Sequence, residues 1–472
     1  MSSGSTRTTT TTASAAFPDL KALVQGEVLT DEQSRRAVSS DFGRMVERVP
    51  RVVVRPRTAK DVAAVMKYAR EKGLKVSSRG EAHTQTGQGL TDGILVDLGS
   101  MHRVLSVDEK GLTSSVEAGC KWRDLVLFLD PKGLVPPVLT NNLGVTIGGT
   151  LSVAGLGISS FKYGAQVDNA LELEVVTGAG DVVTCSPSKE RDLFDCVRSG
   201  LGQFGVITRA TLKLRRRLPM VRTYFLLYDD LDPFMKDSEV MLVDERFDYM
   251  ESWCSPCPQG IRKVEGENLA FAQWFMPYHL TKEFEPGKEP DEKRLLAGLR
   301  HYKKVHVEDK TTLDFSNRLN PLFEIWKRIG YWDRPHPWME NIIPWAASKE
   351  YIHTVLENMQ PQALGGGHVL LWPAKGNTSE APLFKVPKNE KFVMGFGILP
   401  GVPREFLDLA VSKLNQASEL GMMIGAKRYL SGLIHFDESH WEAHFEEDWP
   451  RMKALKKKYD PHLLLNSHFM PL

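Results

Sequence analysis

The stretch that decides the fold runs from residue 146 to residue 213 and reads TIGGTLSVAGLGISSFKYGAQVDNALELEVVTGAGDVVTCSPSKERDLFDCVRSGLGQFGVITRATLK. A glycine-rich turn leads into a helix of small residues, and a hairpin follows that turns at Gly178-Ala179-Gly180. A short helix with an acidic start then precedes a last strand. Strands and helices that alternate in this way predict an α+β domain that binds a nucleotide.

A second glycine-rich turn lies upstream. The residues before it predict a strand, RVVVRP, and a helix that starts at Thr58 and Asp61. Gly73 ends this helix, and LKVSS returns as a strand. The chain then enters the turn RGEAHTQTGQG at residues 79–89. We therefore expect a βαβ unit that leads directly into this turn.

The character of the chain changes after residue 217. The residues that follow hold most of the tryptophans and prolines, with strand-like runs such as FAQWFM and HVLLWPA. We expect helices there near residues 293–304, 348–359 and 403–418. The end of the chain predicts a helix that stops at Asp460-Pro461. The predicted organisation is a disordered tail at 1–16, a first domain at 17–217, a cap domain at 218–430 and a C-terminal segment at 431–472 that returns to the first domain.

The bulk composition is that of a folded protein with more than one domain. The chain has 472 residues, of which 42% are hydrophobic and 25% charged, and its formal net charge is +1. A near-neutral chain gives no reason to expect nucleic acid, because that binding rests on many lysine and arginine contacts with phosphates. No apolar run predicts a membrane helix, and residues 1–16 lack the apolar centre of a secretory signal. With only five cysteines, the chain predicts a cytoplasmic protein.

Two short motifs suggest functions that their context does not support. Gly200, Gly202 and Gly205 satisfy G-x-G-x-x-G, but here the motif follows a predicted helix and precedes a strand, the reverse of a Rossmann fold. Cys254 and Cys257 form an isolated C-x-x-C with no second ligand pair for zinc. We expect neither an NAD-type site nor a metal site.

The two glycine-rich turns, at residues 80–89 and 144–155, are better candidates for a phosphate-binding site. Glycine allows backbone N–H groups to approach an anion, so two facing turns could hold a diphosphate. His83 lies inside the first turn. A neutral imidazole is a nucleophile near pH 7 and could attack the 8α-methyl group of a flavin. From the residues alone, His83 is either this nucleophile or an ordinary loop histidine.

A resemblance to a known family favours the first reading. The chain combines RG-x-x-H-[ST]-x-x-GQ at 79–88, T-[IV]-GGTLS at 146–152, DLFxxVxxGLGQFGVITRA at 192–210, HPW at 336–338 and KYDPxxLL from residue 458. This combination resembles the cytokinin dehydrogenases, FAD flavoproteins of the vanillyl-alcohol oxidase (PCMH) type. The resemblance runs from about residue 50 to the C-terminus. It implies a two-domain α+β fold, with an α/β cap domain over an antiparallel sheet.

The resemblance also implies how the cofactor is held. FAD would be bound through an 8α-N1-histidyl link to His83. Asn142 stands about where related enzymes carry a second, cysteinyl link, so we expect a single attachment. The cofactor-binding residues would be Gly80, Glu81, Ala82, His83, Thr84, Gln88, Thr146, Gly148, Gly149, Ser152 and Ile207.

Two positions depart from the family pattern. Ala82 replaces the second turn glycine, and Asn141 replaces the aspartate that accepts the substrate N–H, a role that a neutral amide cannot fill as a base. The resemblance places a substrate-domain glutamate at Glu251 and a pocket tryptophan at Trp338, and Glu340 shares a face with Trp338 if the segment is extended. We hypothesise that Glu251 or Glu340 supplies the missing carboxylate. The alternative is that both glutamates lie on the surface.

The activity expected from these residues is flavin-dependent oxidation. A small amine or alcohol would lose a hydride to flavin N5, and the electrons would pass to oxygen or a quinone-like acceptor. Cytokinin side-chain cleavage is the nearest named reaction. Two alternatives remain open: a flavin oxidase of a sugar lactone, sterol side chain or secondary metabolite, and a protein that binds FAD without turnover.

Overall fold

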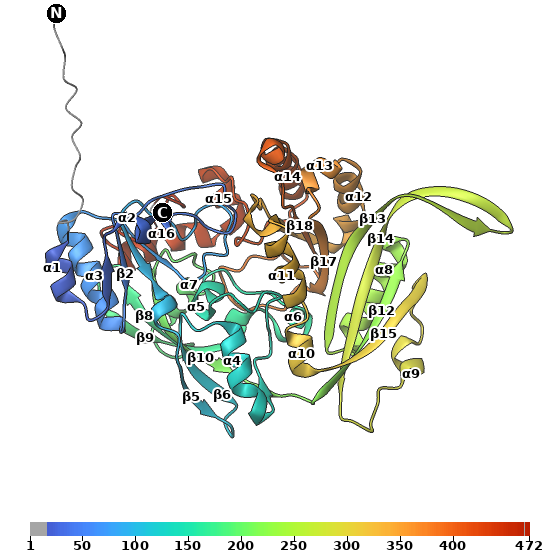
Figure 1. The fold of residues 1–472 in the computed structure, drawn as a ribbon, viewed down its shortest axis with the longest axis horizontal. Coiled ribbons are helices and arrows are strands. Elements are labelled where there is room, and N and C mark those ends of the chain that lie inside the picture. The colour runs from blue at the N-terminus through green and yellow to red at the C-terminus, as the bar shows by residue number, and fades with distance from the viewer. Residues whose placement is uncertain (1–16, 467) are drawn as a thin grey trace, which may run out of the picture.

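The computed structural model describes residues 17–466 and 468–472, which form an α+β fold in which two bodies lie side by side (Figure 1). The first contains a four-stranded sheet and a five-stranded sheet. The second is built on one eight-stranded antiparallel sheet. A separate two-stranded pairing joins β7 (Leu134–Val135), which follows α4 (Trp122–Leu129) in the first body, to β11 (Arg215–Arg216), which comes just before the second body in the sequence.

The expected βαβ unit forms the four-stranded sheet. The helix α3 (Ala59–Lys72) begins after Thr58, whose side chain accepts a hydrogen bond from the Asp61 N–H, and ends at Gly73, which has a φ of 64°. It buries Val62, Val65 and Met66 against the strands. The spatial order is β1 (Glu27–Leu29), β2 (Val52–Arg55), β4 (Ile94–Asp97) and β3 (Val76–Arg79), with β2 and β3 parallel to β4.

The deciding stretch of sequence forms the centre of the five-stranded antiparallel sheet. The predicted hairpin is present as β8 (Ala170–Thr177) and β9 (Val182–Cys185), and the predicted last strand is β10 (Gly205–Lys213). The remaining strands are β5 (Val104–Asp108) and β6 (Thr113–Glu117). The helices α4 (Trp122–Leu129), α5 (Ile147–Leu151) and α7 (Arg191–Val197) contribute side chains to the core that this sheet shares.

The eight-stranded sheet carries the second core. Two of the helices expected beside it are present, as α12 (Ser348–Glu357) and α14 (Leu407–Met423). The helix expected at residues 293–304 is wrong: α9 covers only Glu292–Leu296, and Lys303–Thr311 form the edge strand β15, because this segment pairs with β12. The strands are, in spatial order, β15, β12 (Met220–Tyr228), β14 (Glu267–Phe284), β13 (Tyr249–Val264), β17 (His368–Lys375), β18 (Phe392–Leu399), β16 (Met339–Pro344) and β19 (Lys427–Arg428).

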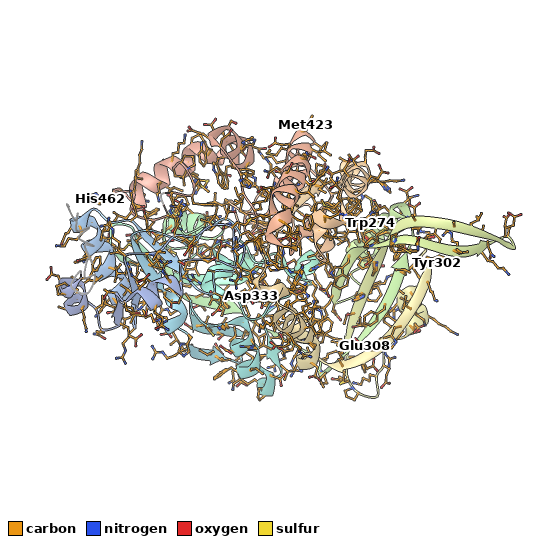
Figure 2. All side chains as sticks on the ribbon, turned by 45° about the horizontal axis from the view of Figure 1, so that its top comes forward. Trp274, Tyr302, Glu308, Asp333, Met423 and His462 are labelled. Carbon is orange, nitrogen blue, oxygen red and sulfur yellow. The ribbon has the colours of Figure 1, made fainter. Side chains whose placement is uncertain are left out.

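Strands β13 and β14 extend beyond this sheet as a two-stranded ribbon. Their neighbours β17 and β12 pair with them only as far as Cys254 and Met276, while β13 and β14 stay paired to Val264 and Glu267. The ribbon projects from the body on the right of Figure 1, and Figure 2 shows Trp274 near the point where it leaves the body. Cys254 and Cys257 both lie in β13, as strand residues.

The end of the chain packs against the first body. Helices α15 (Glu438–Phe445) and α16 (Asp448–Tyr459) lie over it in Figure 1. Their side chains Trp441, Phe445 and Trp449 belong to the same buried core as the five-stranded sheet. In the part of the chain that the structure describes, no helix combines the length and the apolar character needed to cross a bilayer.

Candidate functional site

A cavity of about 600 Å³ lies between the two bodies and is lined by residues of both. Its walls come from the two glycine-rich turns on one side and from strands β13, β16, β17 and β18 on the other. The volume is within the range of ligand and cofactor sites. Every site residue predicted from the sequence lines it: Gly80, Glu81, Ala82, His83, Thr84, Gln88, Asn141, Thr146, Gly148, Gly149, Ser152, Ile207, Glu251, Trp338 and Glu340.

The first turn presents the His83 side chain to this cavity. The turn follows β3, and its residue Ala82 has a φ of 47°, in the left-handed region that costs an L-residue about 1–2 kcal/mol. This conformation explains why a glycine would be favoured there. Burial lowers the pKa of His83 to about 4, so the imidazole is neutral at pH 7 and keeps a free lone pair. The ring is in contact with the Trp338 ring, with 5.4 Å between their centroids.

The second turn packs directly against the first. Thr146 caps α5, with its side-chain oxygen accepting a hydrogen bond from the Gly149 N–H. A Cβ on Gly80 would lie 2.0 Å from the Thr146 hydroxyl oxygen, and one on Gly148 would lie 2.7 Å from the Ala118 Cβ. Only glycine fits at positions 80 and 148, because the two turns and the β6 end approach each other so closely.

The remaining predicted residues of this wall are held by neighbouring segments. Glu81 pairs with Lys121 at 2.8 Å and is exposed at the rim. The Gln88 amide donates to the backbone oxygen of Gly432 at 2.9 Å, which ties the first turn to the C-terminal segment. The Ser152 hydroxyl donates to the Gly148 oxygen at 2.8 Å. The hydroxyl is thus engaged within the protein, and the bare glycine backbone is what this wall offers to a ligand.

These features fit a flavin dinucleotide. Glycines from both turns and from the 200–205 turn form part of the wall, so a diphosphate or a flat ring could lie against the main chain without meeting a Cβ. His83 supplies a neutral nucleophile at the same wall. The glycine residues that line the cavity are Gly80, Gly89, Gly148, Gly149, Gly157, Gly202, Gly205 and Gly366.

Asn141 and Glu251 lie in contact, joined by an arginine that the sequence did not reveal. The Asn141 side-chain N–H donates to Glu251 Oε1 at 2.7 Å. Arg318, in the turn between α10 (Thr312–Ser316) and α11 (Asn320–Arg328), donates to Glu251 Oε2 at 2.9 Å and to Asn141 Oδ1 at 2.8 Å. The three side chains close a ring of hydrogen bonds, which fixes the orientation of the Asn141 amide. The Glu251 charge is already balanced by a guanidinium within this ring.

Glu340 has a different environment. It follows Met339, whose side chain is in the core, so the alternation of the strand turns Glu340 to the cavity. Burial raises its pKa to about 7, while the Arg428 guanidinium acts in the opposite direction. Gly397, on the adjacent strand, leaves room for this side chain: a Cβ there would lie 3.0 Å from the Glu340 Cγ. Glu340 is thus a cavity carboxyl group that changes charge near neutral pH.

Aromatic side chains form much of the wall on the cap side. The sequence showed that tryptophans are concentrated after residue 217, but it could not show which of them share a cavity. Gly395 makes space for one of them, because a Cβ at this position would lie 1.7 Å from the Trp372 ring. A wall of this kind suits a planar, largely apolar ligand. The aromatic members are Trp253, Phe323, Trp326, Trp332, Trp338, His368, Trp372 and Tyr429.

An α+β fold of two bodies, with a glycine wall and a histidine facing aromatic and carboxyl side chains, defines the class of FAD-binding oxidoreductases. Comparison with known proteins gives the family. Residues 50–186 match the family described as "FAD binding domain", and residues 219–468 match the family described as "Cytokinin dehydrogenase 1, FAD and cytokinin binding". The chain belongs to the cytokinin dehydrogenase family, and it is an FAD-dependent oxidoreductase.

Similar proteins match over most of the chain. An uncharacterized oxidoreductase of the fasciation locus of Rhodococcoides fascians is 31% identical, over 92% of this chain and 97% of the relative. Cytokinin dehydrogenase 6 of Oryza sativa subsp. japonica is 31% identical, over 94% of this chain and 91% of the relative. Cytokinin dehydrogenase 7 of the same plant is 30% identical, over 95% and 92% respectively.

Proposed function

We propose that this enzyme oxidises an amine of the cytokinin type, with its FAD attached to His83. The observation that carries the proposal is the shared cavity, in which His83 and Trp338 lie in contact while Asn141, Glu251 and Glu340 line the same space. Bound FAD supplies a hydride acceptor at N5. The names of the rice relatives support this substrate class.

Different residues of the chain would bind the substrate, orient it and accept its proton. The aromatic wall would hold a planar substrate by stacking and exclude water. The ring formed by Asn141, Glu251 and Arg318 would orient the polar edge of the substrate, because its geometry is fixed by three hydrogen bonds. Glu340 would accept the proton that the substrate nitrogen releases, since a base with a pKa of about 7 is matched to neutral pH.

Between the two glutamates that could replace the missing aspartate, we therefore favour Glu340. Glu251 is committed to Arg318 and Asn141, so protonating it would break a charge-assisted hydrogen bond. Glu340 has no such ion pair among the described residues.

We also propose a domain organisation. Residues 17–217 form the FAD-binding domain, residues 218–430 form the substrate domain, and residues 431–472 form a segment that completes the FAD-binding domain.

Anaerobic reduction of the enzyme-bound flavin tests the substrate class. Isopentenyladenine should bleach the flavin absorbance, because it offers a C–H bond next to a substituted nitrogen. Adenine, which lacks that side chain, is the matched control and should leave the absorbance unchanged. If isopentenyladenine leaves the flavin oxidised while a sugar lactone or a simple alcohol bleaches it, the amine assignment is wrong.

A further inference from the structure

Residues 41–43 lie beside the His83 turn and hold it at successive positions. The Phe42 N–H donates to the Ala82 oxygen at 2.9 Å, and the Gly43 N–H donates to the Thr84 oxygen at 2.8 Å. The two acceptors, Ala82 and Thr84, are the residues immediately before and after His83. The segment is thus aligned so that its central residue faces the histidine.

Asp41 also holds the His83 turn, through its side chain. Its Oδ2 accepts hydrogen bonds from the Gly87 N–H at 2.7 Å and from the Thr84 hydroxyl at 3.0 Å. Gly43 permits the close approach, since a Cβ there would lie 2.4 Å from the Gln85 backbone. The turn is therefore bound to this segment through both the main chain and a buried carboxyl group.

Phe42 stacks on the imidazole of His83. The ring centroids lie 4.1 Å apart and the planes are inclined by 11°, which is a parallel stack. The opposite face of Phe42 stacks on His336, at 4.4 Å and 28°. The edges of Trp332 and Trp338 close the remaining sides at 5.1 and 4.9 Å. Phe42 is thus enclosed between two imidazoles and two indoles, and its own plane is fixed.

His336 is a firm support for this stack. It is fully buried, and its backbone N–H donates to the Gly43 oxygen at 3.0 Å, which fixes its main chain against the same segment. Burial lowers the pKa of His336 to about 4, as it does for His83, so both imidazoles are neutral at pH 7 and do not repel each other through Phe42. The order His83, Phe42, His336 is a sandwich of three uncharged rings.

We propose that Phe42 is a positioning residue that sets the plane of the His83 ring for its attachment to the flavin. This inference rests on the proposed link to His83. The left-handed turn at Ala82 places the histidine backbone, but rotation about the side-chain bonds would leave the direction of the ring nitrogens open. The flat contact with Phe42 removes this freedom, and attachment requires the nitrogen to point at one carbon of the flavin.

The bonds and electrons of the proposed attachment balance as follows. A C–N bond would form between the imidazole and the 8α carbon of bound FAD, and the imidazole N–H and one methyl C–H would break. The two hydrogens, with the two electrons of the oxidation, would pass to dioxygen and give hydrogen peroxide. Phe42 takes no part in these transfers and acts only through the orientation of His83.

The test measures attachment and not turnover. Full-length protein from cells grown with limiting riboflavin is incubated with FAD, and the flavin that stays with acid-precipitated protein is followed by fluorescence over time. Phe42→Leu removes the flat ring, so we expect attachment to slow by about 10- to 100-fold, the cost typical of a misplaced reacting group. Phe42→Tyr keeps the ring and should attach at the rate of the unmodified chain. Phe128→Leu, the same change at an exposed position of α4 outside the cavity, should also attach normally.

Each outcome has one meaning. Attachment of Phe42→Leu at the unmodified rate, or loss of attachment in Phe42→Tyr, would overturn the role of Phe42. Near-ultraviolet circular dichroism reports folding, and if Phe42→Leu does not fold, Phe42→Met makes the same comparison with a flexible apolar side chain. If the unmodified chain releases all its flavin on denaturation, the His83 link has failed, which is distinct from a failure of Phe42 alone.

Discussion

Replacing Glu340 with glutamine should remove the dependence of flavin reduction on pH near neutrality. The carboxyl group has a pKa of about 7, against an ordinary value of 4.5. At pH 5 only about 1% of it is ionised, so a proton acceptor at this position predicts reduction about 100-fold slower at pH 5 than at pH 8. Arg428 and Tyr429 are the titratable neighbours on the adjoining segment, and neither changes charge between these pH values.

The assay is stopped-flow reduction of the flavin under anaerobic conditions between pH 5 and pH 9. The unmodified enzyme should show a rise centred near pH 7. Glu340→Gln should be slower at pH 8 by about 10²- to 10⁴-fold, the range for loss of a general base, and its rate should not vary with pH in this window. Glu350→Gln, an exposed change on α12, is the matched control and should behave as the unmodified enzyme. If Glu340→Gln keeps the same rise near pH 7, another group accepts the proton and the reasoning is refuted.

The same substitution has a second signature in stability. Because the pKa of Glu340 is higher in the folded chain than in the unfolded chain, the folded state binds more protons between pH 4.5 and pH 7. The free energy of unfolding therefore falls as pH rises through this window, by at most about 3 kcal/mol. The loss should appear in urea unfolding at pH 4.5 and pH 8 as a difference between the unmodified chain and Glu340→Gln. Buried histidines such as His83 and His336, whose lowered pKa values make stability rise with pH, contribute equally to both chains. An equal pH dependence in both would mean that the folded carboxyl group is not shifted.

Three further predictions concern other parts of the molecule. His83→Ala should bind FAD but release it on acid precipitation, and retention of the colour would place the link elsewhere. Asn141→Asp would set a second carboxylate 2.7 Å from Glu251, so the melting temperature of the variant at pH 7 should fall by several degrees. The melting temperature should recover in the double variant with Glu251→Gln. A fall that the second change does not reverse would exclude this repulsion as its cause. Lys456→Met leaves the buried Asp460, which the lysine contacts at 2.9 Å, without its cationic partner. The free energy of unfolding in urea titration should fall by about 3–5 kcal/mol, whereas a change below about 1 kcal/mol would show that the pair is not essential.

Local patterns in the sequence were enough to predict the first body. The turn residues Gly73 and Gly180 both adopt the positive φ that their positions required, at 64° and 89°. The βαβ unit and the hairpin depend on contacts between near neighbours, which residue spacing reports. The strand at Lys303–Thr311 was missed because it is an exposed edge strand. Its many charged residues leave only a short apolar alternation, at Val305 and Val307, and its pairing with β12 makes it a strand.

The site was predictable to the extent that its residues lie in motifs. Glu340 was singled out only by its spacing from Trp338, and its raised pKa depends on burial that no local pattern contains. Arg318 was missed because it meets Glu251 across a separation of 67 residues, from a turn that carries no motif. Phe42 was missed for the same reason, since its stack on His83 joins two irregular segments. Contacts of this kind are decided by tertiary packing, which spacing along one chain does not encode.

The packing of the C-terminal helices has a consequence for how the chain matures. Trp441, Phe445 and Trp449 complete a core that also includes residues of strands β6, β8 and β10, all of them synthesised more than 200 residues earlier. During translation, one apolar face of that sheet stays uncovered until α15 and α16 have left the ribosome. Nascent chains should therefore expose this face for much of their synthesis, a state that favours chaperone binding.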